Sequence, residues 1–107
     1  MAVKTNKINK IISKYNDVLS KNNIKTSKFV LYGSYAIGKE NKWSDIDLVV
    51  IADSFGRRNA IERMEFLSRK AAEVNESLEV LGYTNKEYNN AKDSIFGEII
   101  ANGLEVK

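Results

Sequence analysis

Phe29-Val30-Leu31-Tyr32-Gly33-Ser34 and, after a short loop, Ser44-Asp45-Ile46-Asp47-Leu48-Val49-Val50 are the two stretches that decide the fold of this chain. The first is an apolar run that stops at Gly33, which predicts a buried strand ending in a turn. The second is rich in β-branched residues and predicts a strand within Trp43 to Ala52. Helical patterns separate these strands from a third, so we expect an α/β (α+β) domain with helices packed on a small sheet.

Helical spacing of apolar residues fills the segments around these strands. It predicts helices over about Val3–Asn22 and over Ala60–Val74, the second with Ile61 on its apolar face. Leu78–Tyr83 is expected as the third strand. The pair Thr84 and Glu87 has the capping-box spacing that opens another helix.

The carboxyl-terminal part continues this alternation. A last helical face is predicted from Ile95, Phe96, Ile99 and Ile100, and Leu104 to Val106 could form a short edge strand. There is no proline, no repeat and no low-complexity segment. We therefore expect residues 1–107 to form a single minimal domain.

Composition narrows the chemistry and the location. With no Cys and no His, disulfides, thiolate metal sites and imidazole catalysis are excluded, which leaves carboxylates, hydroxyls, cations and backbone groups. The start of the chain shows no apolar leader, and no run approaches the ~18 residues of a membrane span. We therefore expect a soluble, cytoplasmic protein without membrane contact. Its net charge of +3 suits phosphate-bearing ligands.

Asp45 and Asp47 are paired carboxylates on the second predicted strand. Because side chains alternate along a strand, the two share a face about 7 Å apart, while Ile46, Leu48 and Val50 point the other way. Two anions beside an apolar run are costly to bury unless a cation compensates them. Mg²⁺, a hard oxygen-binding ion that accompanies phosphates, is the natural candidate. The alternative is that both Asp residues simply lie at a solvated strand end.

Gly33 and Ser34 form the second candidate feature. Glycine lets a phosphate approach the backbone closely, and Tyr35-Ala36-Ile37 could begin a helix whose first N–H groups bind anions. The hydroxyl of Ser34 adds a donor. Taken alone, a Gly-Ser pair after a strand more often forms an ordinary turn than a phosphate-binding one. A phosphate-holding turn followed by paired carboxylates is instead a layout for metal-assisted phosphoryl transfer.

Together, Gly33-Ser34-Tyr35-Ala36-Ile37-Gly38 and Ser44–Val50 resemble the signature of the polymerase-β-like nucleotidyltransferase superfamily, and most closely its minimal nucleotidyltransferase (MNT) group. The resemblance implies the nucleotidyltransferase fold, with a small mixed sheet. It also implies that Gly33 and Ser34 grip the nucleotide triphosphate and that Asp45 and Asp47 bind Mg²⁺.

The superfamily expects a third carboxylate on the neighbouring strand, and Glu79 is the candidate, although Asp is commoner there. The alternative for Glu79 is an outward, solvated strand residue. Asp45, Asp47 and Glu79 would then be the catalytic and metal-binding set. Two Mg²⁺ ions and ATP, or another NTP, are the expected cofactor and substrate. The acceptor hydroxyl would attack the α-phosphorus and displace pyrophosphate.

Other residues are weighed against this set. Asp53 has the same strand parity but lies about 20 Å along an extended strand from Asp47, so it is excluded. Many minimal members carry Arg at the positions of Tyr35 and Ile37, and this chain does not. Lys39 and Lys42 are the candidates to supply that missing charge.

The resemblance also implies a partner. Minimal nucleotidyltransferases are typically encoded beside a small helical HEPN protein and act as the antitoxin of a toxin–antitoxin pair, by transferring AMP to a tyrosine of the partner. A different class of function is an antitoxin-type binding module that neutralises the partner by contact, with little or no catalysis. A nucleic-acid-binding domain is the third and least supported hypothesis, because only the basic charge favours it.

Overall fold

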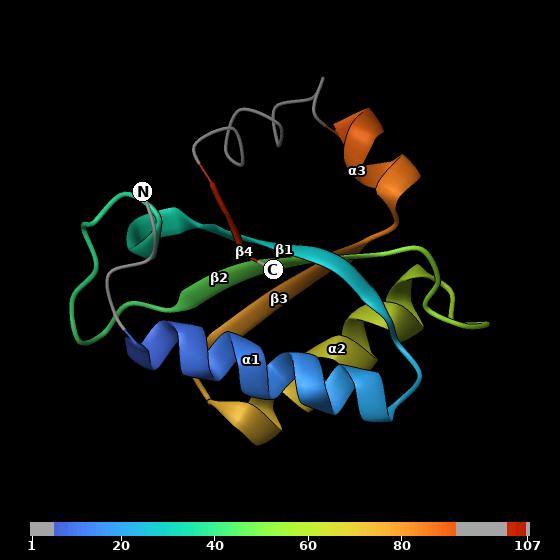
Figure 1. The fold of residues 1–107 in the computed structure, drawn as a ribbon, viewed down its shortest axis with the longest axis horizontal. Coiled ribbons are helices and arrows are strands. Elements are labelled where there is room, and N and C mark those ends of the chain that lie inside the picture. The colour runs from blue at the N-terminus through green and yellow to red at the C-terminus, as the bar shows by residue number, and fades with distance from the viewer. Residues whose placement is uncertain (1–5, 92–102, 107) are drawn as a thin grey trace.

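A computed structural model describes residues 6–91 and 103–106 of the chain (Figure 1). These residues form a four-stranded sheet in the order β3-β2-β1-β4. β1 is antiparallel to both β2 and β4, whereas β2 and β3 are parallel, so the sheet is mixed, as expected. The strands are β1 (Thr26–Tyr32), β2 (Ile46–Ala52), β3 (Leu78–Tyr83) and β4 (Leu104–Val106).

Helices cover both faces of this sheet. In Figure 1, α1 and α2 lie on one side of the strands and α3 lies on the other. α2 has the predicted bounds, and β4 forms the edge strand expected there. The helical face predicted from Ile95, Phe96, Ile99 and Ile100 lies outside the described residues. The helices are α1 (Asn6–Lys21), α2 (Ala60–Val74), α3 (Asn85–Ala91) and the single 3-10 turn η1 (Gly33–Tyr35).

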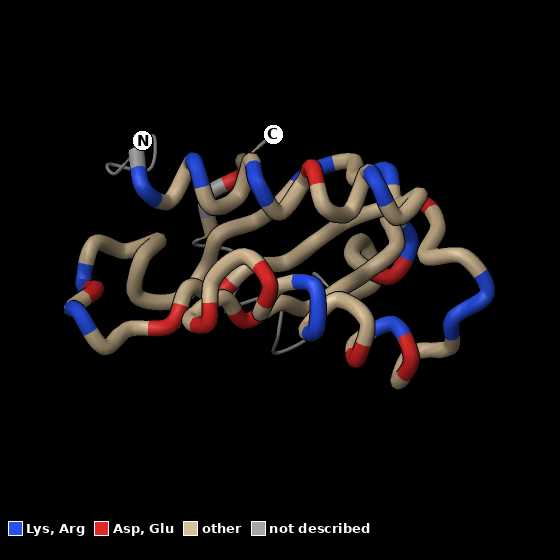
Figure 2. Tube along the Cα trace, turned by 90° about the horizontal axis from the view of Figure 1, so that it is seen from below, with Lys and Arg blue, Asp and Glu red and all other residues tan. Residues whose placement is uncertain are grey.

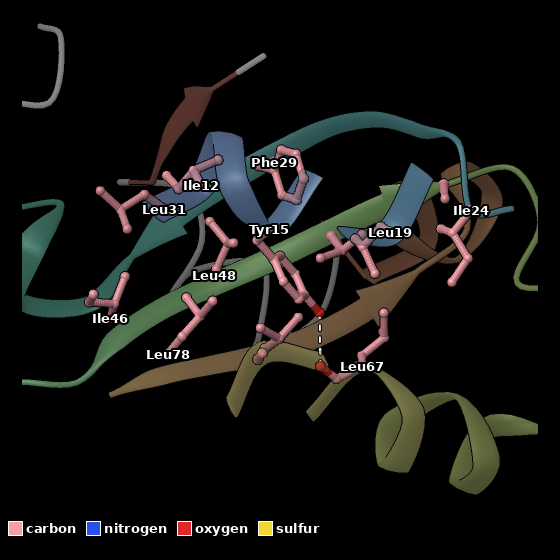
Figure 3. Close-up of a cluster of buried hydrophobic side chains, with 14 of the residues drawn as sticks. Ile12, Tyr15, Leu19, Ile24, Phe29, Leu31, Ile46, Leu48, Leu67 and Leu78 are labelled. Carbon is pink, nitrogen blue, oxygen red and sulfur yellow. Dashed lines mark hydrogen bonds between the residues drawn. The ribbon is translucent and has the colours of Figure 1, made fainter. Parts of the chain in front are cut away.

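Alternation along β2 divides the apolar side chains between two clusters. Leu48 and Val50 belong to the larger cluster, which α1 and α2 cover (Figure 3). Val49 and Ile51 belong to the smaller cluster on the α3 side. The expected orientation of Ile46, Leu48 and Val50 toward one face is therefore confirmed.

One buried polar contact ties the two large helices together. The hydroxyl of Tyr15 on α1 donates a hydrogen bond of 2.9 Å to the carbonyl oxygen of Leu67 on α2 (Figure 3). Both residues are fully buried. Burial also raises the pKa of Tyr15 well above its ordinary value, so the phenol remains a donor.

Two capping boxes start the later helices. Thr84 and Glu87 form the predicted one, with each backbone N–H donating to the other residue's side chain. Asn59 and Glu62 form a second box at the start of α2, which was not predicted from the sequence. Each box satisfies backbone donors that the first turn of a helix leaves unpaired.

Some predicted boundaries and faces were wrong. β1 begins at Thr26 rather than Phe29. β2 lies within the predicted Trp43–Ala52, but it begins only after Asp45, and a hydrogen-bonded turn occupies residues 41–44. Ile61 was predicted on the apolar face of α2 but is 73% exposed. It precedes Leu67 by about 1.7 helical turns, which places it beside the buried stripe rather than within it.

Tyr35-Ala36-Ile37, which could have begun a helix, does not do so. The chain makes only the 3-10 turn η1 and then further turns. Among residues 6–91 and 103–106, no helix is both long and apolar enough to cross a membrane.

Candidate active site

Asp47 and Glu79 lie opposite each other on adjacent strands. The parallel register of β2 and β3 pairs Asp47 with Glu79, and strands in a sheet are about 4.8 Å apart. Both side chains stand on the face that carries α3, since Asp47 alternates with the core residues Leu48 and Val50. Asp47 is half-buried and Glu79 is exposed. The sheet therefore brings together two carboxylates that are far apart in the chain.

The electrostatics of Asp47 reflect these neighbours. Burial raises the pKa of Asp47, and the negative charges of Glu79 and Asp45 raise it further. A carboxylate beside like charges is destabilised in its ionised form, and a bound cation would relieve that repulsion.

Asp45 occupies a different position from the one predicted. It precedes β2 instead of lying on it, and it is exposed. Backbone hydrogen bonds toward β3 start only after Asp45. The N–H of Ile46 donates a hydrogen bond of 2.8 Å to the carbonyl oxygen of Ser77. The prediction that both Asp residues lie on the strand therefore holds only for Asp47.

The turn at Gly33 is in direct contact with Asp47. Gly33 has a φ of +75°, a conformation that L side chains rarely adopt. A Cβ placed on Gly33 would overlap the Oδ2 atom of Asp47. Ser34 follows in η1, where its carbonyl accepts a hydrogen bond of 2.9 Å from the N–H of Lys39. The structure therefore brings the Gly33-Ser34 turn and the Asp47 carboxylate together.

Tyr32 is a neighbour of the site that the sequence patterns did not single out. It is paired with Asp47 across β1 and β2, so Tyr32, Asp47 and Glu79 form one row across three strands. Burial and the charges of Asp47 and Glu79, with Tyr83, raise the pKa of Tyr32 to about 12. Its place one residue before the Gly turn, at the end of a strand, is the signal that could have found it.

The other residues weighed in the sequence analysis lie away from Asp47 or are exposed in a loop. Asp53 follows the far end of β2 and accepts a hydrogen bond from Asn85 at the start of α3, in agreement with its exclusion. Lys39 and Lys42 are exposed in the loop after η1. A cavity of about 360 Å³ is lined by α2 side chains and Arg58, with none of the site residues in its wall.

Comparison with known proteins identifies the family. Residues 12–100 match the family model described as "Nucleotidyltransferase domain". The chain belongs to this family. No curated protein sequence matches it significantly.

A solved structure supports the fold of the nucleotidyltransferase domain. It is the crystal structure of a Sulfolobus solfataricus protein provisionally named a nucleotidyltransferase, with 18% sequence identity and a TM-score of 0.63. The likeness covers 90% of this chain and 76% of that one. At this identity the match shows the shared fold alone.

The site is suited to the divalent metal that nucleotidyltransferases generally use with a nucleoside triphosphate. Asp45, Asp47 and Glu79 offer carboxylate oxygens, which Mg²⁺ and similar hard ions prefer. Within the described part of the chain, no three His, Cys, Asp or Glu side chains already converge as a metal-binding cluster. The donor chemistry and the mutual repulsion at Asp47 fit a cation, and the assignment of these three ligands stays a prediction.

Proposed function

We propose that this nucleotidyltransferase domain transfers AMP from ATP to a hydroxyl group of a partner protein. The supporting observation is that Asp47 faces Glu79 across β2 and β3 while Gly33 contacts the same Asp47 carboxylate. Family membership supports nucleotide transfer in general. The choice of ATP and of a protein acceptor follows from the resemblance to minimal nucleotidyltransferases.

The Gly33-Ser34 turn would hold the triphosphate. Because Gly33 has no side chain, the Asp47 carboxylate packs directly against its backbone, so a phosphate held by this turn would lie beside Asp47. The hydroxyl of Ser34 can donate to a phosphate oxygen, and the first N–H groups of a helical turn have no partner within it. Because only one 3-10 turn follows, these few donors would take the place of the full helix N-terminus that the sequence allowed. Lys39 and Lys42 remain the proposed source of additional positive charge.

The carboxylates would bind and orient the reacting groups. Asp45, Asp47 and Glu79 would hold Mg²⁺, which when bound neutralises triphosphate charge and lowers the pKa of the attacking hydroxyl. Glu79 is more exposed than Asp47, with which it is paired, and it can take the proton of that hydroxyl. The acceptor oxygen then bonds to the α-phosphorus, and pyrophosphate leaves.

The acceptor we propose is a separate helical protein of the HEPN type, with this chain as the antitoxin. Glu79 is exposed on an edge strand of the described sheet, so a hydroxyl of another polypeptide can reach it from solvent. An acceptor domain within the described residues is not needed for that approach.

Labelling tests this function directly. The purified chain is incubated with Mg²⁺, ATP labelled at the α-phosphate, and a co-expressed HEPN partner or an extract of the source cells. The matched variant carries Asp45→Asn and Asp47→Asn, and Asp53→Asn serves as the control at the far end of β2. We expect label on one protein band with the wild type and with Asp53→Asn, and none with the double variant.

The outcomes separate the two classes of function. No label with any version, together with a partner that still co-purifies with the double variant, would replace transfer by neutralisation through contact. Label on RNA instead of protein would keep the enzyme and overturn the protein acceptor. Label with the double variant would remove Asp45 and Asp47 from the mechanism.

A further inference from the structure

Trp43 is the most exposed large apolar side chain among the described residues, with 82% of its surface open to solvent. It is also the single tryptophan of the chain. Tryptophan is normally among the more buried residue types, since its large ring gains from leaving water. A ring left in solvent is therefore available for a contact with another molecule.

The backbone around Trp43 is held by a closed set of hydrogen bonds. The N–H of Trp43 donates a hydrogen bond of 2.8 Å to the side-chain oxygen of Asn41. The N–H of Ser44 donates a hydrogen bond of 3.0 Å to the carbonyl oxygen of Asn41. In return, the N–H of Asn41 donates a hydrogen bond of 2.9 Å to the hydroxyl oxygen of Ser44. The turn thus presents the ring outward on a defined support, which limits the entropy lost on binding.

This turn lies next to the candidate active site. Trp43 precedes Asp45 by two residues, so their Cα atoms are at most about 7 Å apart. The loop projects from one end of the sheet in Figure 1, and in Figure 2 the same loop, at the left, carries both basic and acidic positions. The side-chain nitrogen of Lys42 lies 4.9 Å from the centre of the Trp43 ring. An aromatic ring and a cation are therefore presented together within three residues of Asp45.

We infer that Trp43 stacks on the nucleobase of the bound nucleoside triphosphate. The inference rests on the proposed function, since it requires the triphosphate to be held by the Gly33-Ser34 turn, beside Asp47. A nucleotide anchored there extends from its phosphates by the length of one ribose before its planar base begins. The flat ring of Trp43 matches that base. The ammonium of Lys42 lies over one face of the ring, so the base stacks on the other face.

Stacking on Trp43 predicts how the domain selects among nucleobases. Every base has a π face, so an aromatic platform binds bases without reading their hydrogen-bonding edges. ATP, GTP, CTP and UTP should therefore all use Trp43, and inorganic tripolyphosphate, which has no base, should not. Selection of one base would require contacts other than this ring.

The experiment measures binding rather than turnover. With Mg²⁺ present, ATP and tripolyphosphate are titrated separately into the wild type, Trp43→Ala, Trp43→Phe and Ile37→Ala, using calorimetry and, where Trp43 remains, its fluorescence. Ile37 is the matched control because it is an exposed apolar residue of the same loop, at 56%. Thermal unfolding of each variant checks that the fold is intact.

We expect ATP to quench the fluorescence of Trp43, and tripolyphosphate to bind without quenching it. Trp43→Ala should weaken ATP binding by about 5- to 150-fold, the equivalent of about 1–3 kcal/mol of stacking, and leave tripolyphosphate binding unchanged. Trp43→Phe should retain most of the affinity, and Ile37→Ala all of it.

Two results would overturn the inference while the proposed function stands. One is equal ATP affinity of the wild type and Trp43→Ala. The other is an equal loss for ATP and tripolyphosphate, which would mean that the turn, and not the ring, matters. Failure of the wild type to bind either ligand would instead overturn the proposed function, and the stacking with it.

Discussion

Gly33 and Asp47 are in such close contact that a Cβ on the glycine would overlap the Oδ2 atom of the aspartate. The contact joins the end of β1 to β2, where Tyr32 and Asp47 are paired. It places the carboxylate beside the Gly33-Ser34 turn, which we propose binds the triphosphate. The requirement for glycine here thus has two causes, the positive φ and the missing space.

A matched glycine separates these causes. Gly38 has nearly the same φ, +73°, but nothing lies within 4 Å of where its Cβ would be. Gly38→Ala should therefore cost only the strain of the left-handed conformation, about 1–2 kcal/mol. Gly33→Ala should cost more and should also displace Asp47, so that nucleotide binding falls. Chemical denaturation and calorimetry measure the two effects, and equal losses for both variants would contradict the close contact.

Asp47→Asn should stabilise the fold at neutral pH while abolishing transfer. The pKa of Asp47 is raised, so ionisation costs more in the folded chain than in the unfolded one. This penalty is absent below the unfolded pKa, near 3.9, and grows as pH rises through the folded pKa. Removing the charge should gain about 0.2–1 kcal/mol at pH ~7, in the range of cross-strand pairs.

Thermal unfolding against pH provides the measurement. The melting temperature of Asp47→Asn should exceed that of the wild type at neutral pH, and the two should converge as the medium becomes acidic. Asp17→Asn, an exposed acid of α1, should show no such gain. A lower melting temperature for Asp47→Asn at neutral pH would argue against repulsion between Asp47 and its neighbours.

Glu79→Gln should reduce transfer without weakening the fold. Glu79 is exposed, so replacing it leaves no buried group unpaired, and loss of a general base typically costs about 10²- to 10⁴-fold in rate. Its control is Glu76→Gln, an exposed acid just before β3. A rate assay alongside a melting curve distinguishes the two roles. Full activity of Glu79→Gln would leave Glu79 as an ordinary solvated strand residue.

Tyr15→Phe should destabilise the packing of α1 on α2. The substitution keeps the ring and removes the donor to the carbonyl of Leu67, which is buried. The Leu67 carbonyl lies in the middle of α2 and keeps its helical N–H partner, so losing the Tyr15 donor should cost about 0.5–1.5 kcal/mol, the net value of one hydrogen bond. Tyr35→Phe, at a half-buried tyrosine, is the control and should cost less. Urea denaturation gives both values, and a neutral Tyr15→Phe would show that this hydrogen bond contributes nothing net.

Local patterns predicted much of the fold correctly. The bounds of α2 follow from its apolar spacing, and the Thr84–Glu87 capping box follows from residue types that satisfy helix N–H groups locally. The helix that Tyr35-Ala36-Ile37 could have begun did not form, since propensity in so short a segment is overridden by the turns that return the chain to β2. The outward position of Ile61 was missed for a related reason, because spacing does not say where a buried stripe ends.

The sequence by itself determined the bounds of α2 and β3, the alternation that separates Leu48 from Asp47, and the two motifs that resemble a nucleotidyltransferase. These depend on interactions between residues close together in the chain. Only the tertiary structure decided that Glu79 faces Asp47, that Tyr32 completes their row, and that Gly33 leaves no room for a side chain. Strand pairing and register depend on how the whole core packs, so no local pattern specifies which distant residues become neighbours.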